Sequence, residues 1–179
     1  MKIFNVLVFT LLSTFAINNV AVAQYNEADA KTIVDIAVSS DDHTTLVAAL
    51  KAAGLVEALQ GDGPFTVFAP NNTAFEALPE GTVSTLLKPE NKGQLTNILT
   101  YHVVSGSFDA AAVVQAIEDN DGMVSLEALN GDMITAYLKD GSVYLKDENG
   151  GTSKVTVTDL KGSNGVIHVI ESVILPESK

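Results

Sequence analysis

Apolar residues in the first half of the chain recur at the three- and four-residue spacing of an amphipathic helix. The clearest stripe consists of Leu46, Ala49, Leu50 and Ala53. Gly54 follows it directly, in the position of a left-handed helix C-cap. The spacing therefore predicts a helix over residues 43–53, with a carboxylate of Asp41-Asp42 as its N-cap.

Other helices and one strand are expected in the same half. A helical pattern starts at Thr32, and Asp109 is a second N-cap candidate. The remaining helices expected are a short one capped by Asn72 and two more over residues 83–87 and 91–99. Residues 65–69 form a β-branched and aromatic run that ends at Pro70, which indicates a buried strand.

The apolar period changes to two after Gly122, and turn sequences such as Asn130-Gly131 separate the alternating segments. The expected strands cover residues 123–128, 133–138, 142–146, 154–158 and 166–175. Both faces of the last strand are apolar, which predicts a central strand with His168 as a hydrogen-bonded core residue. Helices followed by hairpins predict an α+β fold, with the helices on one side or end of an antiparallel sheet system.

Composition removes several classes of function. The chain has no cysteine, so it can hold neither a disulfide, nor a thiolate metal site, nor a cysteine nucleophile. All ten basic residues are lysine, against 22 acidic residues, and the formal net charge is -12. A nucleic-acid partner is therefore not expected, because the chain repels polyanions overall and lacks guanidinium groups.

The first 23 residues have the features of a secretory signal peptide. Lys2 precedes an apolar stretch over residues 3–17, and Ala21-Val22-Ala23 fits a small-x-small cleavage site. The alternative, a membrane anchor, needs about 20 predominantly apolar residues, which is more than this run provides. We expect cleavage after Ala23, a secreted product in the periplasm or outside the cell, and no stable membrane insertion afterwards.

The rest of the chain is long enough for one domain. Residues 24–31 are a short polar lead-in, residues 32–176 are the expected domain, and residues 177–179 are a tail.

Recognisable catalytic motifs do not occur in the sequence. The serine-hydrolase pattern Gly-x-Ser-x-Gly is missing, and Gly61-Asp62-Gly63 lacks the third glycine of a dinucleotide-binding loop. The carboxylate pairs Asp41-Asp42 and Asp147-Glu148 suit helix caps and turns as well as glycoside chemistry. These patterns predict no cofactor and nominate no catalytic residue.

A metal site has equally little support. The histidines stand at positions 43, 102 and 168, so no His-x-x-x-His pair is available. The segment Asp119-Asn120-Asp121-Gly122 resembles part of a calcium loop. Its register fails, because Ala128 occupies the position of the bidentate glutamate. A solvated acidic turn is expected there.

Three stretches, in this order, resemble the boxes of the fasciclin-like domain. They are residues 65–75, residues 99–104 with the central Tyr101-His102 pair, and residues 164–176. The resemblance covers residues 32–176. It implies a β-sandwich or wedge of antiparallel strands with several short helices packed around it, a role in adhesion, and no catalytic residues. Asn71 departs from the serine or threonine usual in the family, and the acidic integrin motifs of some animal members have no match.

Tyr101 and His102 are the candidate binding residues, because the resemblance assigns their segment to adhesion. The physical alternative is structural. The pair follows an expected helix and opens the apolar Val103-Val104 run, where a buried ring with a satisfied polar tip is common. Both interpretations stay open at the level of sequence.

The function expected from these observations is that of an exported, non-enzymatic adhesion module. Its partner would be a protein or polysaccharide of a cell surface, extracellular matrix or biofilm. The alternatives are an exported small-molecule or glycan-binding protein with a pocket between helices and sheet, and, third, a hydrolase with a novel carboxylate pair. A deep polar pocket would favour these alternatives, whereas a shallow apolar surface would favour adhesion.

Overall fold

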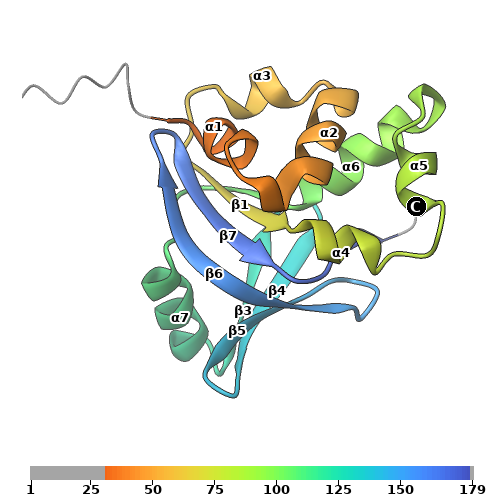
Figure 1. Cartoon of the computed structure of the whole chain (residues 1–179). Helices are drawn as coiled ribbons and strands as arrows, with labels where there is room; N and C mark the ends of the chain where they lie inside the picture. The colour runs from red at the N-terminus through yellow and green to blue at the C-terminus, as the bar shows by residue number, and fades with distance from the viewer. Residues whose placement is uncertain (1–30, 178–179) are drawn as a thin grey trace, which may run out of the picture.

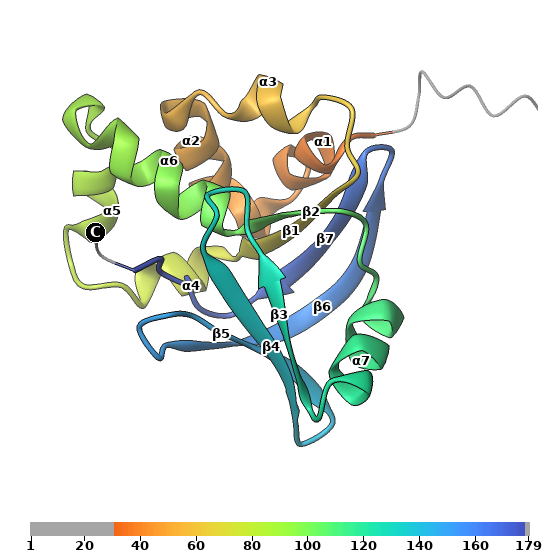
Figure 2. The same cartoon turned by 180° about the vertical axis from the view of Figure 1, so that it is seen from behind.

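The computed structural model describes residues 31–177. The expected signal peptide, its cleavage site, residues 24–30 of the lead-in and the last two residues of the tail lie outside this range. Within it, no helix has both the length and the apolar character needed to cross a membrane. The protein has helices gathered at one end of a curved sheet and one further helix on the other side (Figures 1 and 2).

The predicted elements occur in the expected order along the chain, and the structure adds a short helix over residues 56–59 and a short strand over residues 103–105, which were not predicted. The helices are α1 (Ile33–Val38), α2 (Thr44–Ala53), α3 (Val56–Leu59), α4 (Asn72–Glu76), α5 (Thr82–Leu86), α6 (Lys92–Tyr101) and α7 (Ala110–Asp119), with 3₁₀ turns η2 (Asp41–His43) and η3 (Pro89–Asn91). The strands are β1 (Phe65–Pro70), β2 (Val103–Ser105), β3 (Met123–Glu127), β4 (Met133–Lys139), β5 (Ser142–Lys146), β6 (Thr152–Gly162) and β7 (Gly165–Ile170). This arrangement confirms the α+β class.

Among the described residues, the strands form one seven-stranded sheet in the order β2-β1-β7-β6-β5-β4-β3. Its pairings are antiparallel, as expected, except that β1 and β7 run parallel. A parallel pair needs a long crossover, which the whole chain between β1 and β7 provides, so hairpin signals could not reveal it. A bridge between Val104 and Ala128 joins the two ends of the sheet, which gives a wedge approaching a closed barrel.

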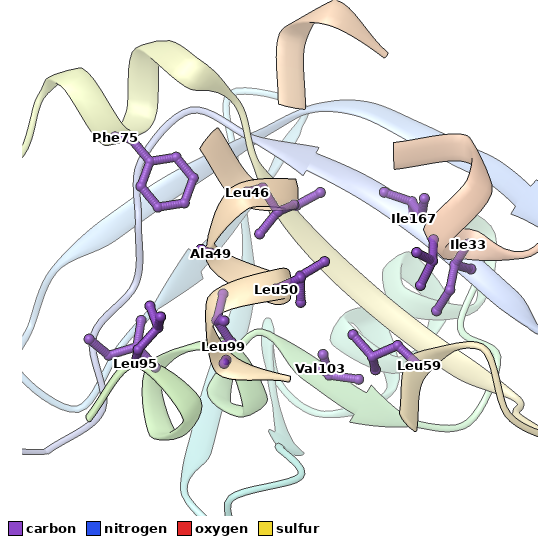
Figure 3. Packing of buried hydrophobic residues seen from close by; sticks show 14 of the residues in the cluster. Ile33, Leu46, Ala49, Leu50, Leu59, Phe75, Leu95, Leu99, Val103 and Ile167 are labelled. Carbon is purple, nitrogen blue, oxygen red and sulfur yellow. The ribbon is translucent and has the colours of Figure 1, made fainter. Parts of the chain in front are cut away.

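The β1–β7 pair lies between two hydrophobic clusters. Ala69 and Ile167 face the first cluster, which fills the space under α1, α2 and α6 (Figure 3). Phe68 and Ile170 face the second, which lies against α7 and the β3–β5 strands. All six residues of β7 are buried, which confirms the central strand predicted from its two apolar faces.

The end of β7 differs from the sequence expectation, which extended this strand to residue 175. The strand stops at Ile170, and the following residues turn away from the sheet. Glu171 N still donates to the carbonyl oxygen of Lys154 on β6 (3.1 Å). Beyond it, backbone N–H groups donate to side chains: Ser172 to Ser153 Oγ (2.9 Å), Ile174 to His102 Nε2 (3.2 Å) and Leu175 to Asp147 Oδ2 (3.0 Å). Alternation alone could not distinguish these residues from a strand.

Strand β6 is longer than the expected residues 154–158. It pairs first with β5 and then with β7, and its register against β7 shifts twice between Val155 and Leu160. Such bulges break the period-two pattern, so the sequence indicated only part of the strand.

Two predicted helix caps are wrong and two are confirmed. Helix α4 is capped by Asn71, whose Oδ1 accepts from Ala74 N at 2.8 Å, and not by Asn72. Neither carboxylate of Asp41-Asp42 caps α2, because these residues form the preceding 3₁₀ turn. Gly54 does adopt the left-handed C-cap conformation (φ 73°), and Asp109 caps α7 by accepting from Ala112 N at 2.8 Å.

Asn72 instead ties α4 to α2. Its side chain accepts from Thr45 N (3.1 Å) and donates to the carbonyl of Asp41 (2.9 Å). Asn72 therefore makes tertiary contacts between two helices, which local capping rules cannot predict.

Candidate functional site

Tyr101 is the last residue of α6, and its ring is fully buried in the second hydrophobic cluster. Its hydroxyl donates to the carbonyl oxygen of Met133 at 2.8 Å, which connects the helix end to β4. Burial raises the pKa of the Tyr101 hydroxyl above its usual value, so the hydroxyl is neutral and serves as a donor. This is the buried ring with a satisfied polar tip that the sequence offered as the structural alternative.

His102 is the C-cap of α6, and it is 2% exposed. Its Nδ1 lies 2.7 Å from the carbonyl oxygen of Ile98, and its Nε2 accepts from Ile174 N at 3.2 Å. A carbonyl can only accept, so the proton is on Nδ1 and the lone pair is on Nε2. One imidazole thus closes the helix end and holds the segment that follows β7.

Burial lowers the pKa of His102 from 6.5 to about 4, because the charged imidazolium cannot be solvated inside the protein. The contact with Ile98 and the charge of Asp147 oppose this shift but do not cancel it. At neutral pH the ring is therefore uncharged, as its two hydrogen bonds require.

An apolar groove of about 240 Å³ lies beside His102, between α4, α5, α6 and the segment after β7. The residues that line the groove are Pro70, Phe75, Leu78, Pro79, Thr82, Leu86, Gln94, Leu95, Ile98, Leu99, His102, Val173 and Leu175. Leu175, at 37% exposure, is one of its accessible apolar side chains. Residues of the second sequence box, 99–104, and of the third box, 164–176, both line the groove. Sequence patterns alone do not show that these two boxes are neighbours in space.

The segment after β7 is a part of the site that sequence reasoning missed. Asp147 holds it from the β5–β6 turn, where its carboxylate also accepts from Asn149 N (3.1 Å) and Gly151 N (2.6 Å). Asn149 Nδ2 donates to the carbonyls of Leu175 (2.9 Å) and Pro176 (3.0 Å). A turn role for Asp147 was expected, but its partner at the C-terminal end had no local signal.

The other two histidines lie apart from this site. His168 Nε2 lies 2.7 Å from the carbonyl oxygen of Phe108, and its ring stacks on Phe68, which confirms the predicted core histidine. His43 Nδ1 lies 2.8 Å from Ser40 Oγ, and burial lowers the pKa of its ring. In residues 31–177, no group of three or more histidines or carboxylates is placed to hold a metal ion.

The fold is shared with a solved FAS1 domain pair from the insect cell adhesion molecule fasciclin I. The likeness has a TM-score of 0.73 at 18% sequence identity and covers 81% of this chain and 51% of that one. At this identity the likeness establishes the architecture: a helix-covered β-wedge of the FAS1 type.

Sequence comparisons establish the family. The fasciclin domain profile matches residues 41–176. Protein sll1483 of Synechocystis is 46% identical over 187 residues, with 96% of each chain covered. The transforming growth factor-beta-induced protein ig-h3 of Sus scrofa is 37% identical over 150 residues, which cover 81% of this chain and 19% of that protein. The chain belongs to the fasciclin domain family.

The structure predicts distinct costs for two changes at Tyr101. Tyr101→Ala removes a fully buried ring and should lower the free energy of unfolding by roughly 3 to 5 kcal/mol. Tyr101→Phe keeps the ring, deletes the donor to Met133 and should cost about 1 kcal/mol. Chemical denaturation monitored by circular dichroism measures both values. A fully stable Tyr101→Ala protein would contradict the burial of this ring.

His102 should make stability depend on acidity. Between about pH 6.5 and about pH 4 the unfolded chain binds a proton at this ring while the folded chain does not, so stability falls as the pH falls through this window. The shift corresponds to a loss of about 3 kcal/mol across the window. Denaturation curves at successive pH values measure it.

His102→Gln is the control for this pH dependence, because glutamine does not titrate. The variant should be less stable at pH 7 and should lose less stability than the natural protein on acidification. His43, whose pKa shifts in the same direction, and the carboxylates are common to both proteins. Equal acid losses in the two proteins would show that His102 is not the responsible group.

Proposed function

We propose that this chain is an exported, non-enzymatic interaction module that mediates adhesion to a component of a cell surface, matrix or biofilm. Membership of the fasciclin domain family supports the proposal, and the solved relative is described as a cell adhesion molecule. The observation that carries it is the apolar groove beside His102.

The size and chemistry of the groove favour contact with apolar side chains of a macromolecule. Pockets for small ligands usually measure about 300 to 1,000 Å³ and contain several convergent polar groups. This groove is about 240 Å³, and its lining is mostly aliphatic. It can take an apolar anchor side chain of a partner, which is the usual centre of a protein interface.

Within this proposal, Tyr101 and His102 have different tasks. His102 forms part of the groove wall and fixes the segment that carries Val173 and Leu175. Tyr101 is enclosed in the core and positions the end of α6. We propose that the pair supports binding by holding the groove in shape, with His102 the closer of the two to a bound partner.

A charge placed at the rim of the groove should reduce adhesion. Leu175→Lys puts an ammonium group beside the apolar lining, where a partner's apolar anchor would have to bury it. We expect fewer cells of the source organism to attach to a surface coated with this variant than to one coated with the natural protein. Counting adherent cells on coated and albumin-blocked surfaces measures the effect.

Val38→Lys is the matched control, since Val38 is 54% exposed on α1 and is not part of the groove. Its adhesion and melting temperature should equal those of the natural protein. Unchanged adhesion of Leu175→Lys would rule out the groove, and a natural protein no more adhesive than albumin would overturn the proposed function.

We also propose that export removes residues 1–23, which leaves a secreted chain that begins at Gln24. The intact mass of the exported protein, recovered from the periplasm or the medium, tests this directly. A mass that includes Met1 to Ala23 would indicate an uncleaved N-terminal anchor instead.

A further inference from the structure

Three Asn-Gly pairs occur in the chain, at positions 130–131, 149–150 and 164–165. Asparagine is a thermolabile residue, because its side-chain amide can be lost as ammonia. The loss is easiest before glycine, since no Cβ hinders the approach of the next backbone nitrogen to the amide carbon. The structure surrounds the three pairs differently, and these differences decide which asparagine can react.

The Asn164-Gly165 pair is fixed inside the fold. Asn164 Nδ2 donates to two backbone carbonyls, at 2.8 and 3.0 Å, and its Oδ1 accepts from Ile33 N at 3.0 Å. Gly165 is buried in β7, where the backbone of Phe65 lies directly against it. The amide of Asn164 therefore cannot reorient, and the nitrogen of Gly165 is shielded from water.

The Asn130-Gly131 pair is also restrained. Asn130 is partly buried, and its Oδ1 accepts from Asp132 N at 3.1 Å. Its Nδ2 donates to Asp132 Oδ2 at 2.7 Å and to Asn97 Oδ1 at 3.1 Å. Both atoms of this amide are therefore held by side-chain or backbone partners.

The Asn149-Gly150 pair is the accessible one. Both residues are exposed in the β5–β6 turn, and nothing lies within 4 Å of the position that a Cβ of Gly150 would take. In residues 31–177, Asn149 Oδ1 accepts no hydrogen bond, and Gly150 N makes only a 3.2 Å contact with the carbonyl of Asp147. Water and base can therefore reach both reacting groups.

We propose that Asn149 is a site of spontaneous deamidation, and that its conversion releases the C-terminal wall of the apolar groove. Solvent base takes the proton of Gly150 N, and this nitrogen attacks Cγ of Asn149. The new N–Cγ bond closes a succinimide ring as the Cγ–Nδ2 bond breaks and ammonia leaves. Water then opens the ring at either carbonyl, which leaves aspartate or isoaspartate at position 149.

The amide that is lost is a latch for the segment after β7. Asn149 Nδ2 donates to the carbonyls of Leu175 (2.9 Å) and Pro176 (3.0 Å). A carboxylate has no N–H group to donate, and its oxygens repel the two carbonyl oxygens. The reaction therefore replaces two hydrogen bonds by an unfavourable contact.

The isoaspartate product affects a second latch. It lengthens the backbone by one carbon inside the turn in which Asp147 accepts from Gly151 N and from Leu175 N. Leu175 lines the groove, so its release removes part of one wall. The modification itself does not depend on the role of the groove, whereas its effect on adhesion rests on the proposed function.

The modification is tested on the full exported protein, kept in mildly alkaline buffer and sampled over time. Peptide mapping by mass spectrometry, with an isoaspartate methyltransferase assay, locates the products. We expect conversion at Asn149 before any at Asn130 or Asn164. Asn149→Gln is the control, because glutamine would have to close a slower six-membered ring. No conversion at Asn149, or faster conversion at either other asparagine, would overturn the proposal.

The release of the segment is tested with Asn149→Asp, which carries one of the two products permanently. The amide of Leu175 should exchange its hydrogen about tenfold faster than in the natural protein, because two exposed hydrogen bonds are lost. Exchange at Ile167 in β7 should stay unchanged, which separates local release from global unfolding. Asn130→Asp is the matched control and should leave Leu175 exchange unaltered. Equal exchange at Leu175 in the natural protein and Asn149→Asp would overturn the latch.

Adhesion assays on fresh and aged samples connect the latch to the groove. Ageing should lower the adhesion of the natural protein and leave that of Asn149→Gln at its fresh value. Equal losses in both proteins would disprove the connection. If the fresh natural protein is no more adhesive than albumin, the proposed function fails, while the mapping and exchange measurements still decide the modification and the release.

Discussion

The parallel pairing of β1 with β7 is the interaction on which the rest of the structure depends. It joins the first and third sequence boxes, which are separated by most of the domain. One face of the pair packs against the first hydrophobic cluster and the other face against the second. The strands approach so closely at their start that a Cβ on Gly165 would overlap the carbonyl oxygen of Phe65. Because such a pairing requires closing a very long loop, it depends on burial of both faces and on the helices that cover one of them.

The buried polar groups beside this pair decide how the remaining segments are arranged. His102 is placed in the interior with one donor and one acceptor, and the carbonyl of Ile98 and the N–H of Ile174 satisfy them. Leaving either unpaired would cost about 1 to 3 kcal/mol, so the ring fixes both the end of α6 and the path of the chain after β7. The apolar groove is a consequence of this path, since Val173 and Leu175 form one of its walls.

The proposed binding groove depends on contacts between distant parts of the fold. The groove combines helices with the C-terminal segment, so its shape follows from long-range contacts through His102 and Asp147. Much of the groove lining, such as Phe75, Leu95 and Leu99, also belongs to the first hydrophobic cluster, so the groove cannot change without affecting the core.

The sequence by itself determined the order and type of most elements, the burial of β7 and the helix ends at Gly54 and Asp109, because these follow from local periodicity and local capping. It also suggested Tyr101 and His102, without deciding between support and contact. Only the tertiary structure decided the parallel β1–β7 pairing, the end of β7 at Ile170, and the groove beside His102. These features depend on hydrogen bonds and packing between residues far apart in the chain. Hydrophobic alternation cannot predict them, because a segment shows the same alternation whether it pairs with a strand or donates hydrogen bonds to buried side chains.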